Sequence, residues 1–193
     1  MNNLQQLGMK KNWLYEFVVS SYNNNIPHAA PFGVKSSNFK CVTIKMYKGS
    51  NTLRNVLANK EFVLNQVDDP IFFYQALYAR EKINFNPAKM IKAPVIADSP
   101  SSIEVKLINA INKKRSIIIE AKVVHVHIRN IGELTNRAKS LVLESLILST
   151  RLSRFPKPKL NKLIKENYRV IKKVAPGSKY ETIMQELLNN CDC

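Results

Sequence analysis

The sequence predicts an α+β fold, in which a six-stranded antiparallel β-barrel with short helices is followed by a C-terminal helical subdomain. Segments rich in β-branched and aromatic residues fill the first two thirds of the 193-residue chain. After Gly132 the hydrophobic residues repeat instead at three- and four-residue intervals. A hydrophobic content of 45% suffices for one good core with a small second lobe. We therefore expect a barrel domain over residues 1–130 and a helical extension over residues 131–193.

The first two strands are expected to form a hairpin. Residues 14–19 are aromatic and β-branched, and Asn23-Asn24-Asn25 supplies a turn because Asn tolerates left-handed backbone angles. The return arm, residues 26–35, contains Pro27 and Pro31, each without an amide hydrogen. This strand must therefore be an edge strand or be interrupted.

The next elements are a strand, a short helix and another strand. Residues 39–46 alternate with period two, which predicts a third strand. Helical spacing begins at Thr52, and either Ser50 or Asn51 is a suitable N-cap. Residues 61–67 return to a strand pattern.

A second short helix, residues 71–79, is opened by Asp68-Asp69-Pro70 through an acidic first turn and a proline. Residues 82–102 carry three prolines without periodicity and predict a long surface loop. Residues 103–111 and 116–128 predict two long strands joined in a hairpin, which brings the total to about six, enough to close a small barrel. Five aromatic residues are interpreted as helix packing rather than a cofactor site: Trp13, Phe72, Phe73, Tyr74 and Tyr78.

Three helices are expected in the extension. A long amphipathic helix begins at Leu134 and is stopped by Pro156 and Pro158, a second spans residues 160–171, and a third runs over residues 179–190. These helices either wrap the barrel or contact a partner subunit.

Composition narrows the class of protein. No run approaches the roughly 18 to 20 apolar residues of a membrane span, and the N-terminal segment lacks the apolar core of a secretory signal, so we expect a cytoplasmic protein. Cys41, Cys191 and Cys193 give no disulfide framework, and the terminal pair is either a frayed tail or a metal or redox site.

The formal net charge of +16 attracts phosphates, acidic lipids and nucleic acid alike. Basic residues crowd the second half, in the turn at 113–115 and between Arg151 and Lys173. This leaves two interpretations open, a solubilising basic face and a nucleic-acid-binding surface, and no aromatic residues are interleaved with these lysines as a base-stacking platform requires.

Several kinds of catalytic site are disfavoured. The sequence contains no serine nucleophile elbow, Walker-type loop or CxxC motif. His125 and His127 share one face of a strand and are two potential zinc ligands, but no third ligand is nearby in sequence, which favours a solvated or core-edge pair.

Two segments have the features of a nucleotide site. From Lys48 to Arg54 the chain offers two cations, a permissive Gly49, the hydroxyls of Ser50 and Thr52, and the free amides of a helix start, which together suit a phosphate. From Ala29 to Val34 small residues, Pro31 and Gly33 interrupt a strand and leave room for a flat ring against the backbone. A plain helix cap and a plain strand bend are the alternative interpretations.

The order and spacing of several segments resemble flavin-reductase-like FMN-binding split barrels, and within them an uncharacterised, mainly archaeal branch whose barrel is followed by helices. The segments are Ala30-Pro31-Phe32-Gly33, Lys48 to Asn55, Glu61 to Asn65, Asp68-Asp69-Pro70, Asn136-Arg137-Ala138, and Glu144 through Thr150-Arg151-Leu152. The resemblance covers most of the chain from Leu14 to Leu152 and implies a six-stranded antiparallel split β-barrel.

The resemblance also implies a homodimer with FMN at the subunit interface, its phosphate near Ser50 to Thr52 and its ring near Pro31 to Val34. It further implies that Asn65 and Asp68 line the pocket and that Arg137 approaches it. The expected cofactor-binding residues are Pro31, Phe32, Gly33, Val34, Lys48, Ser50, Asn51, Thr52, Asn65 and Asp68. No catalytic residue is implied, because flavin itself performs hydride or electron transfer. His28 stands where such proteins carry a smaller polar residue.

The expected function is an FMN-binding flavoprotein. An NAD(P)H-dependent flavin reductase, a related oxidoreductase and a flavoprotein without catalytic activity all stay open. The alternative is a basic nucleic-acid-binding module on a split-barrel scaffold. An FMN phosphate carries about two negative charges at neutral pH, so the excess positive charge needs a separate explanation.

Overall fold

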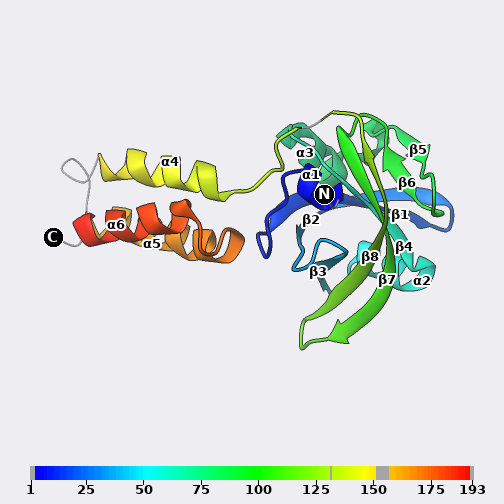
Figure 1. Cartoon of the computed structure of the whole chain (residues 1–193), viewed down its shortest axis with the longest axis horizontal. Helices are drawn as coiled ribbons and strands as arrows, with labels where there is room; N and C mark the ends of the chain where they lie inside the picture. The colour runs from blue at the N-terminus through cyan, green and yellow to red at the C-terminus, as the bar shows by residue number, and fades with distance from the viewer. Residues whose placement is uncertain (1–2, 131, 151–156, 192–193) are drawn as a thin grey trace. The chain divides into compact units, whose positions relative to one another are not determined.

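The computed structural model describes residues 3–130, 132–150 and 157–191. It divides into two compact units, a barrel unit built mainly from Tyr15–Thr135 and a helical unit built from Asn12–Leu14 and the chain from Asn136 onward (Figure 1). The predictions for Arg151, Leu152, Pro156 and Cys193 fall outside the described residues.

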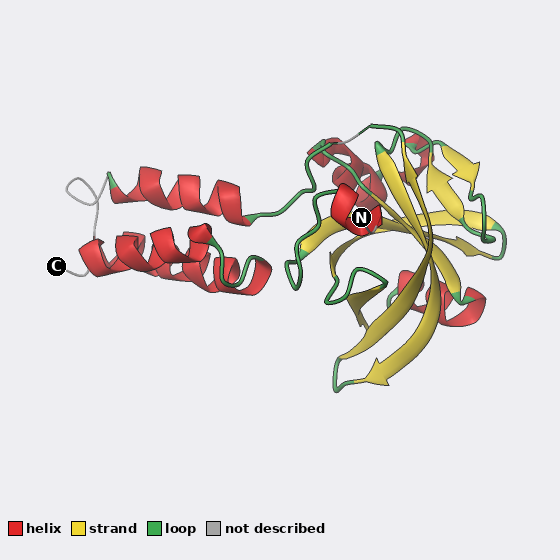
Figure 2. Ribbon diagram, in the orientation of Figure 1, coloured by secondary structure: helices red, strands yellow, loops and turns green. Residues whose placement is uncertain are grey.

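Six antiparallel strands close into a barrel in the order β1-β2-β3-β8-β7-β4. Figure 2 shows the strands in yellow and the helices in red. Their bounds are β1 Tyr15–Asn23, β2 Ile26–Lys35, β3 Cys41–Tyr47, β4 Glu61–Asn65, β7 Ser101–Asn112 and β8 Ser116–Ile128. The predicted α+β class, with a six-stranded antiparallel barrel followed by helices, is therefore confirmed.

Strand β2 is paired very unequally with its two neighbours. It pairs with β1 along its whole length, from Tyr15 opposite Val34 to Asn23 opposite Ile26, but with β3 only at Val34 and Lys35. The interruption expected from Pro27 and Pro31 is confirmed, because a proline cannot donate to a ladder on the side that its nitrogen faces.

The barrel core is filled by alternate residues of the strands. In β3 the side chains of Val42, Ile44 and Met46 are buried, as the period-two pattern predicts. Phe17 of β1 and Phe62 of β4 are also fully buried.

Two short helices follow β3 and β4. Helix α2 (Asn51–Asn59) is capped by Ser50, and helix α3 (Pro70–Tyr78) by Asp69, whose carboxylate accepts a hydrogen bond from the Ile71 amide at 2.8 Å. An additional four-residue helix, α1 (Asn3–Gln6), was not expected from the sequence.

The expected long loop over residues 82–102 is wrong in part. This segment contains a two-stranded sheet of β5 (Phe85–Pro87) and β6 (Pro94–Ile96), preceded by the 3₁₀ turn η1 (Arg80–Lys82). Strands of three residues are too short to show a hydrophobic period, so only the prolines were visible in the sequence. Asn65 fixes this sheet to the barrel, because its Oδ1 accepts a hydrogen bond from the Ile96 amide at 2.9 Å.

The packing interpretation of the α3 aromatics is correct for two of them and wrong for the other two. Phe72 and Phe73 pack on buried core residues, whereas Tyr74 and Tyr78 are 56% and 75% exposed. Their two rings are tilted by 46° with centroids 5.5 Å apart. An apolar stripe on the outer side of a surface helix is not distinguishable in sequence from one on its inner side.

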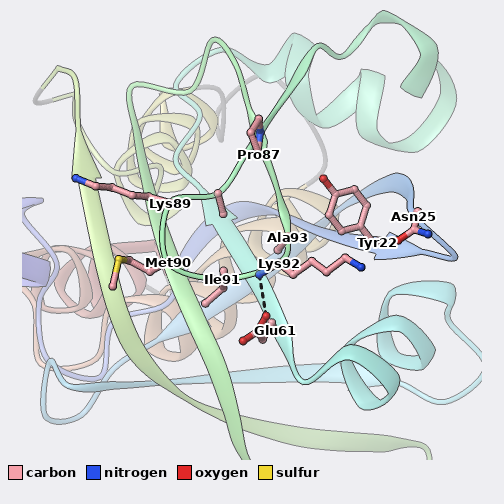
Figure 3. A pocket seen from close by; sticks show the side chains of 10 residues that line it. Tyr22, Asn25, Glu61, Pro87, Lys89, Met90, Ile91, Lys92 and Ala93 are labelled. Atoms are coloured by element: carbon pink, nitrogen blue, oxygen red, sulfur yellow. Dashed lines mark hydrogen bonds between the residues drawn. The ribbon is translucent and has the colours of Figure 1, made fainter.

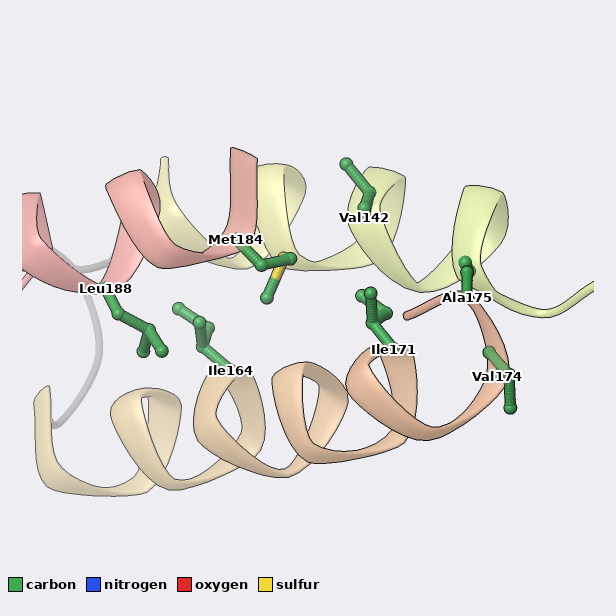
Figure 4. Close-up of a cluster of buried hydrophobic side chains, with 8 residues drawn as sticks. Val142, Ile164, Ile171, Val174, Ala175, Met184 and Leu188 are labelled. Atoms are coloured by element: carbon green, nitrogen blue, oxygen red, sulfur yellow. The ribbon is translucent and has the colours of Figure 1, made fainter. Parts of the chain in front are cut away.

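The helical unit contains α4 (Ala138–Ser149), α5 (Lys157–Val174) and α6 (Lys179–Cys191). Helix α4 begins four residues later than Leu134, where Asn136 Oδ1 accepts a hydrogen bond from the Ala138 amide at 2.9 Å. Figure 4 shows Ile164 and Ile171 of α5 directed toward Met184 of α6, in a core that also holds Val142. Trp13 packs against this core, with its ring centroid 6.2 Å from that of Tyr180.

Among the described residues, no helix is long and apolar enough to cross a membrane.

Candidate functional site

The start of helix α2 presents free backbone amides at the barrel surface. The Ser50 hydroxyl donates to the Tyr47 carbonyl at 2.9 Å and accepts from the Leu53 amide at 3.3 Å, so this side chain is committed to the cap. Asn51 and Thr52 are the first helical residues, and their amides have no carbonyl one turn earlier to bond. These amides carry the partial positive charge of the helix N-terminus.

A cavity of about 490 Å³ lies beside this helix start. Its lining combines the beginning of β2, the first residue of α2 and the segment that follows α3: Asn23, Ile26, Pro27, His28, Asn51, Arg80, Glu81, Ile83 and Phe85. Segments distant in sequence therefore converge on the region expected to bind a phosphate.

Arg80 is the cation of this cavity. Its Nε donates to the main-chain oxygens of Ala76, at 2.8 Å, and Ala29, at 3.1 Å. These bonds fix the base of the guanidinium, while its two terminal nitrogens make no hydrogen bond to the described part of the chain. Exposed Glu81 is the one acidic residue of the lining and partly offsets this charge.

His28 connects β2 to α2 in the wall of the cavity. Its Nε2 lies 2.9 Å from Oγ1 of Thr52, and both side chains are buried. Burial lowers the pKa of His28 from its ordinary value of 6.5, and the nearby charge of Arg80 lowers it further. The imidazole is therefore neutral at pH 7.

The residues expected to face a flavin ring lie farther along β2. Pro31, Phe32 and Gly33 are half-buried, whereas the Val34 side chain is buried in the barrel core. Phe32 stands opposite Phe17 of β1. Pro31, Phe32 and Gly33 lie on the part of β2 that β3 does not pair, so one side of their main chain is free of the ladder, whereas Val34 pairs with Ile44 of β3.

Of the ten expected site residues, only Asn51 is among the residues that line this cavity. Three of the others belong neither to the expected ring segment of β2 nor to the first turn of α2. Lys48 is exposed, with its amide bonded to the Arg115 carbonyl at 3.2 Å. Asn65 is fully buried, and its Nδ2 donates to the Val18 carbonyl and the Ser20 hydroxyl. Asp68 is exposed just before α3.

Sequence reasoning missed Arg80 and noted His28 only as a departure from similar proteins. Arg80 is positioned by the packing of α3 against β2, which carries its side chain to the Ala29 carbonyl. His28 is positioned by its pairing with β1 and by its bond to Thr52. No local motif surrounds Arg80, and nothing in the sequence could have indicated this contact.

A second cavity, of about 570 Å³, lies on the barrel unit beside the loop between β5 and β6 (Figure 3). The amides of this loop are already bonded to carboxylates of the protein. Buried Glu104 accepts from Lys89 and Met90 at 2.7 and 2.8 Å, and Glu61 accepts from Lys92 at 2.8 Å. Because these donors are occupied, this cavity is a poorer seat for an anion than the cavity at α2.

The structure does not support a metal site at the two histidines of β8. His125 is half-buried and His127 exposed, and no group of three or more potential ligands occurs within residues 3–130, 132–150 and 157–191.

Comparison with known proteins agrees with this architecture. Models of a family described as "Protein of unknown function (DUF447)" match residues 15–130, as its N-terminal domain, and residues 136–189. The uncharacterized protein MJ1453 of Methanocaldococcus jannaschii is 27% identical over 188 residues, which cover 91% of this chain and 96% of that protein.

Solved structures extend the likeness to the fold. The crystal structure of the FMN-bound protein MM1853 from Methanosarcina mazei, of the same DUF447 family, has 25% identity and a TM-score of 0.58, over 97% of this chain and 99% of that chain. Flavin reductase HpaC in complex with NADP+ has 21% identity and a TM-score of 0.54, over 67% and 88%. The barrel is thus of the flavin-reductase-like split type, as the sequence resemblance implied.

Proposed function

Because the chain belongs to the DUF447 family, whose member MM1853 is described as FMN-bound, we propose that it is an FMN-binding flavoprotein. The observation that carries the proposal is the cavity at the start of α2, where a fixed guanidinium, a buried histidine and free helix amides meet.

In this proposal the FMN phosphate occupies the cavity between Asn51 and Arg80. The free amides of Asn51 and Thr52 and the terminal nitrogens of Arg80 donate to the phosphate oxygens, an arrangement that suits a dianion at a helix N-terminus. With its proton on Nε2, His28 donates to Thr52 Oγ1 and leaves the Thr52 hydroxyl hydrogen free for the phosphate. Ser50 holds the cap, and Lys48 adds positive potential from outside.

The isoalloxazine ring is proposed to lie along Pro31, Phe32, Gly33 and Val34. From His28 to Phe32 a strand advances about 13 Å, which suits the ribityl chain and ring of one mononucleotide. The main-chain groups that β3 leaves unpaired can bond the polar edge of the ring. Asn65 acts in this proposal by holding β1 and β6 together. Asp68, which is exposed before α3 and outside the cavity lining, has no role in it.

The proposal includes a homodimer with FMN at the subunit interface. It is supported by the apolar outer side of α3, formed by exposed Ile71, Tyr74, Leu77 and Tyr78. Contiguous exposed apolar surface of this kind is typical of a protein interface.

We extend the proposal to an NAD(P)H-dependent flavin reductase or a related oxidoreductase. When bound, the flavin supplies hydride or electron transfer, and the residues of this chain bind and orient it. No residue of the cavity is required to act as a general acid or base.

The direct test is binding of flavin to the purified chain. We expect a yellow protein, or uptake of one FMN per chain after removal of any bound flavin, measured by quenching of flavin fluorescence. Riboflavin should bind at least about 100-fold more weakly, since two charge-assisted hydrogen bonds of about 1.5 kcal/mol each are lost with the phosphate. Failure to take up FMN would contradict the proposal, and equal affinities would contradict the phosphate site alone.

Rapid mixing of the FMN-bound protein with NADH or NADPH tests the oxidoreductase part separately. Loss of flavin absorbance near 450 nm on the order of seconds or faster is the outcome that supports it. If the flavin stays oxidised with both donors, the oxidoreductase part of the proposal is wrong and the flavin-binding part is unaffected.

A further inference from the structure

Helix α5 carries a row of cations on its exposed side. Lys162, Lys165, Arg169, Lys172 and Lys173 recur at three- and four-residue intervals, and all five are exposed. We refer to these five residues as the α5 stripe. Glu166 is the one acidic residue among the 18 of the helix, and its carboxylate pairs with Arg169 at 2.6 Å.

The opposite side of α5 is already packed. Leu160, Ile164, Ile171 and Val174 are buried, and three of them belong to the core of the helical unit. An amphipathic helix that binds a lipid surface must insert its apolar face, which is not available here. Leu163 of α5 is 45% exposed, but the α5 stripe itself presents charge rather than apolar area.

The stripe has the dimensions of a short stretch of nucleic-acid backbone. Eleven residues separate Lys162 from Lys173, which is about 16 Å along a helix. One strand of B-form DNA carries a phosphate about every 3.4 Å of axis, so this length matches about five phosphates. We propose that the α5 stripe binds the sugar-phosphate backbone of nucleic acid without reading its sequence.

The aromatic content of α5 favours backbone contact over base contact. Its aromatic residue, Tyr168, is half-buried, and its hydroxyl donates to Gln185 Oε1 at 2.6 Å. A ring held in this way is not a platform for stacking bases. The chain has a net charge of +16, whereas a cofactor phosphate carries only about two negative charges. Nucleic-acid binding by the α5 stripe would account for part of the remaining positive charge.

The test measures affinity of the full-length, flavin-loaded chain for a fluorescent 20-base-pair DNA duplex, and for a single strand of the same length, between 50 and about 300 mM salt. Because Glu166 already pairs with Arg169, up to four phosphates are neutralised, which gives a slope of log K against log salt of about −3.6 for the duplex and about −2.8 for the single strand. The proposal does not rest on flavin binding, so flavin-free protein should give the same slopes.

Two variants with equal charge change locate the surface. Replacing Lys162, Lys172 and Lys173 by Gln should reduce the magnitude of the duplex slope by nearly three and the affinity at 50 mM salt by at least tenfold. Replacing Lys113, Lys114 and Arg115 by Gln, in the exposed turn between β7 and β8, should change the slope by less than about one. Circular dichroism checks that both variants are folded. Gln is a good helix former, so the α5 variant should keep its helix.

Three outcomes would overturn the proposal. The first is no binding at 50 mM salt, and the second is a slope that the turn variant reduces and the α5 variant does not. The third is an affinity for polyglutamate, of the same net charge as the DNA, that equals the affinity for the DNA. This outcome would assign the α5 stripe to an acidic protein partner.

Discussion

His28 and Thr52 are joined side chain to side chain, with Nε2 of the ring 2.9 Å from Oγ1 of the hydroxyl, although 24 residues separate them. The bond ties the second strand of the barrel to the first turn of α2, at the wall of the cavity proposed to hold the FMN phosphate. The protonation state of one imidazole therefore bears on both the stability of the barrel and its affinity for an anion.

The stability of flavin-free protein should depend on His28 in mildly acidic solution. Burial, and then Arg80, lower its pKa from the ordinary value of 6.5, so the folded chain binds this proton less tightly than the unfolded chain. The contribution is complete above pH 6.5 and is lost as pH falls through the lower folded value. Thermal unfolding between pH 8 and 5 should show this loss, and His28→Gln should flatten the profile. Equal profiles would contradict this role.

Bound FMN should reverse the sign of this effect. A phosphate dianion beside His28 raises the pKa of the ring, so binding takes up a proton. The ratio of FMN affinities between wild type and His28→Gln should therefore increase as pH falls from 8 to 6. Because the phosphate's own titration is common to both proteins, it cancels in this ratio, and a constant ratio would count against His28 as a neighbour of the phosphate.

Arg80→Gln should weaken FMN binding by about 10- to 100-fold, because a hydrogen bond to a charged group contributes about 1.5–3 kcal/mol. Riboflavin affinity should change by less than about threefold. The matched control is Arg115→Gln, since Arg115 is exposed in the turn between β7 and β8 and is not among the lining residues of the cavity. Equal losses for FMN and riboflavin would indicate general damage to the fold rather than a lost phosphate contact.

Glu61 should make the barrel sensitive to acid. Hydrogen bonds from the Lys106 ammonium and then from the Lys92 amide hold the pKa of Glu61 below its usual 4.5. Its stabilising contribution is present above that usual value and is lost as pH falls through the folded value. Because the group is partly exposed, we expect about 0.5–1 kcal/mol at most. Urea unfolding at pH 7 and pH 3.5 should show a smaller difference in Glu61→Gln than in wild type.

The outer face of α3 should control the oligomeric state. Changing both Tyr74 and Tyr78 to Lys places cations in the proposed dimer interface. Dimer dissociation should rise at least about 30-fold, as loss of a central interface tyrosine costs about 2 kcal/mol or more. Sedimentation velocity provides the measurement, with Met90→Lys as an exposed control on another part of the barrel unit. If the wild-type protein is a monomer, the proposed dimer is wrong, whereas the proposal of FMN binding is not affected.

The helical core can be tested at adjacent positions. Ile164→Ala removes a fully buried side chain and should cost about 2–5 kcal/mol, whereas Leu163→Ala changes a residue that is 45% exposed and should cost less than about 1 kcal/mol. The single tryptophan, Trp13, packs against this core, so its fluorescence reports unfolding of the helical unit. Similar costs for both variants would contradict the observed orientation of α5.

Local patterns in the sequence predicted most elements correctly. Asn23-Asn24-Asn25 identified the first hairpin, and Asn24 and Asn25 adopt the positive φ angles that make asparagine suitable there. Ser50 was one of two residues expected to cap α2, and it is the cap. Both signals depend on neighbouring residues alone, which is why the sequence contains them.

Features that depend on packing could not be predicted. Arg80 reaches the cavity because α3 lies against β2, and β5 and β6 exist because Asn65 and the barrel support them. The outward direction of Tyr74 and Tyr78 is likewise a property of the assembled barrel rather than of the helix sequence. The residue types at these positions are compatible with several tertiary structures. Only the contacts in the folded protein show which of these structures forms.

The limited pairing of β2 with β3 has a consequence for how sequences of this kind can diverge. Since the Ala29 carbonyl faces Arg80, alternation along the strand turns the polar main-chain atoms of Pro31 and Gly33 to the same side. A ligand that is bound through main-chain hydrogen bonds requires little of the neighbouring side chains, except that they are small enough to leave room for it. In the proposed ring site, substitutions can therefore accumulate without loss of flavin binding, and distant relatives would keep the proposed binding surface while its residue identities differ.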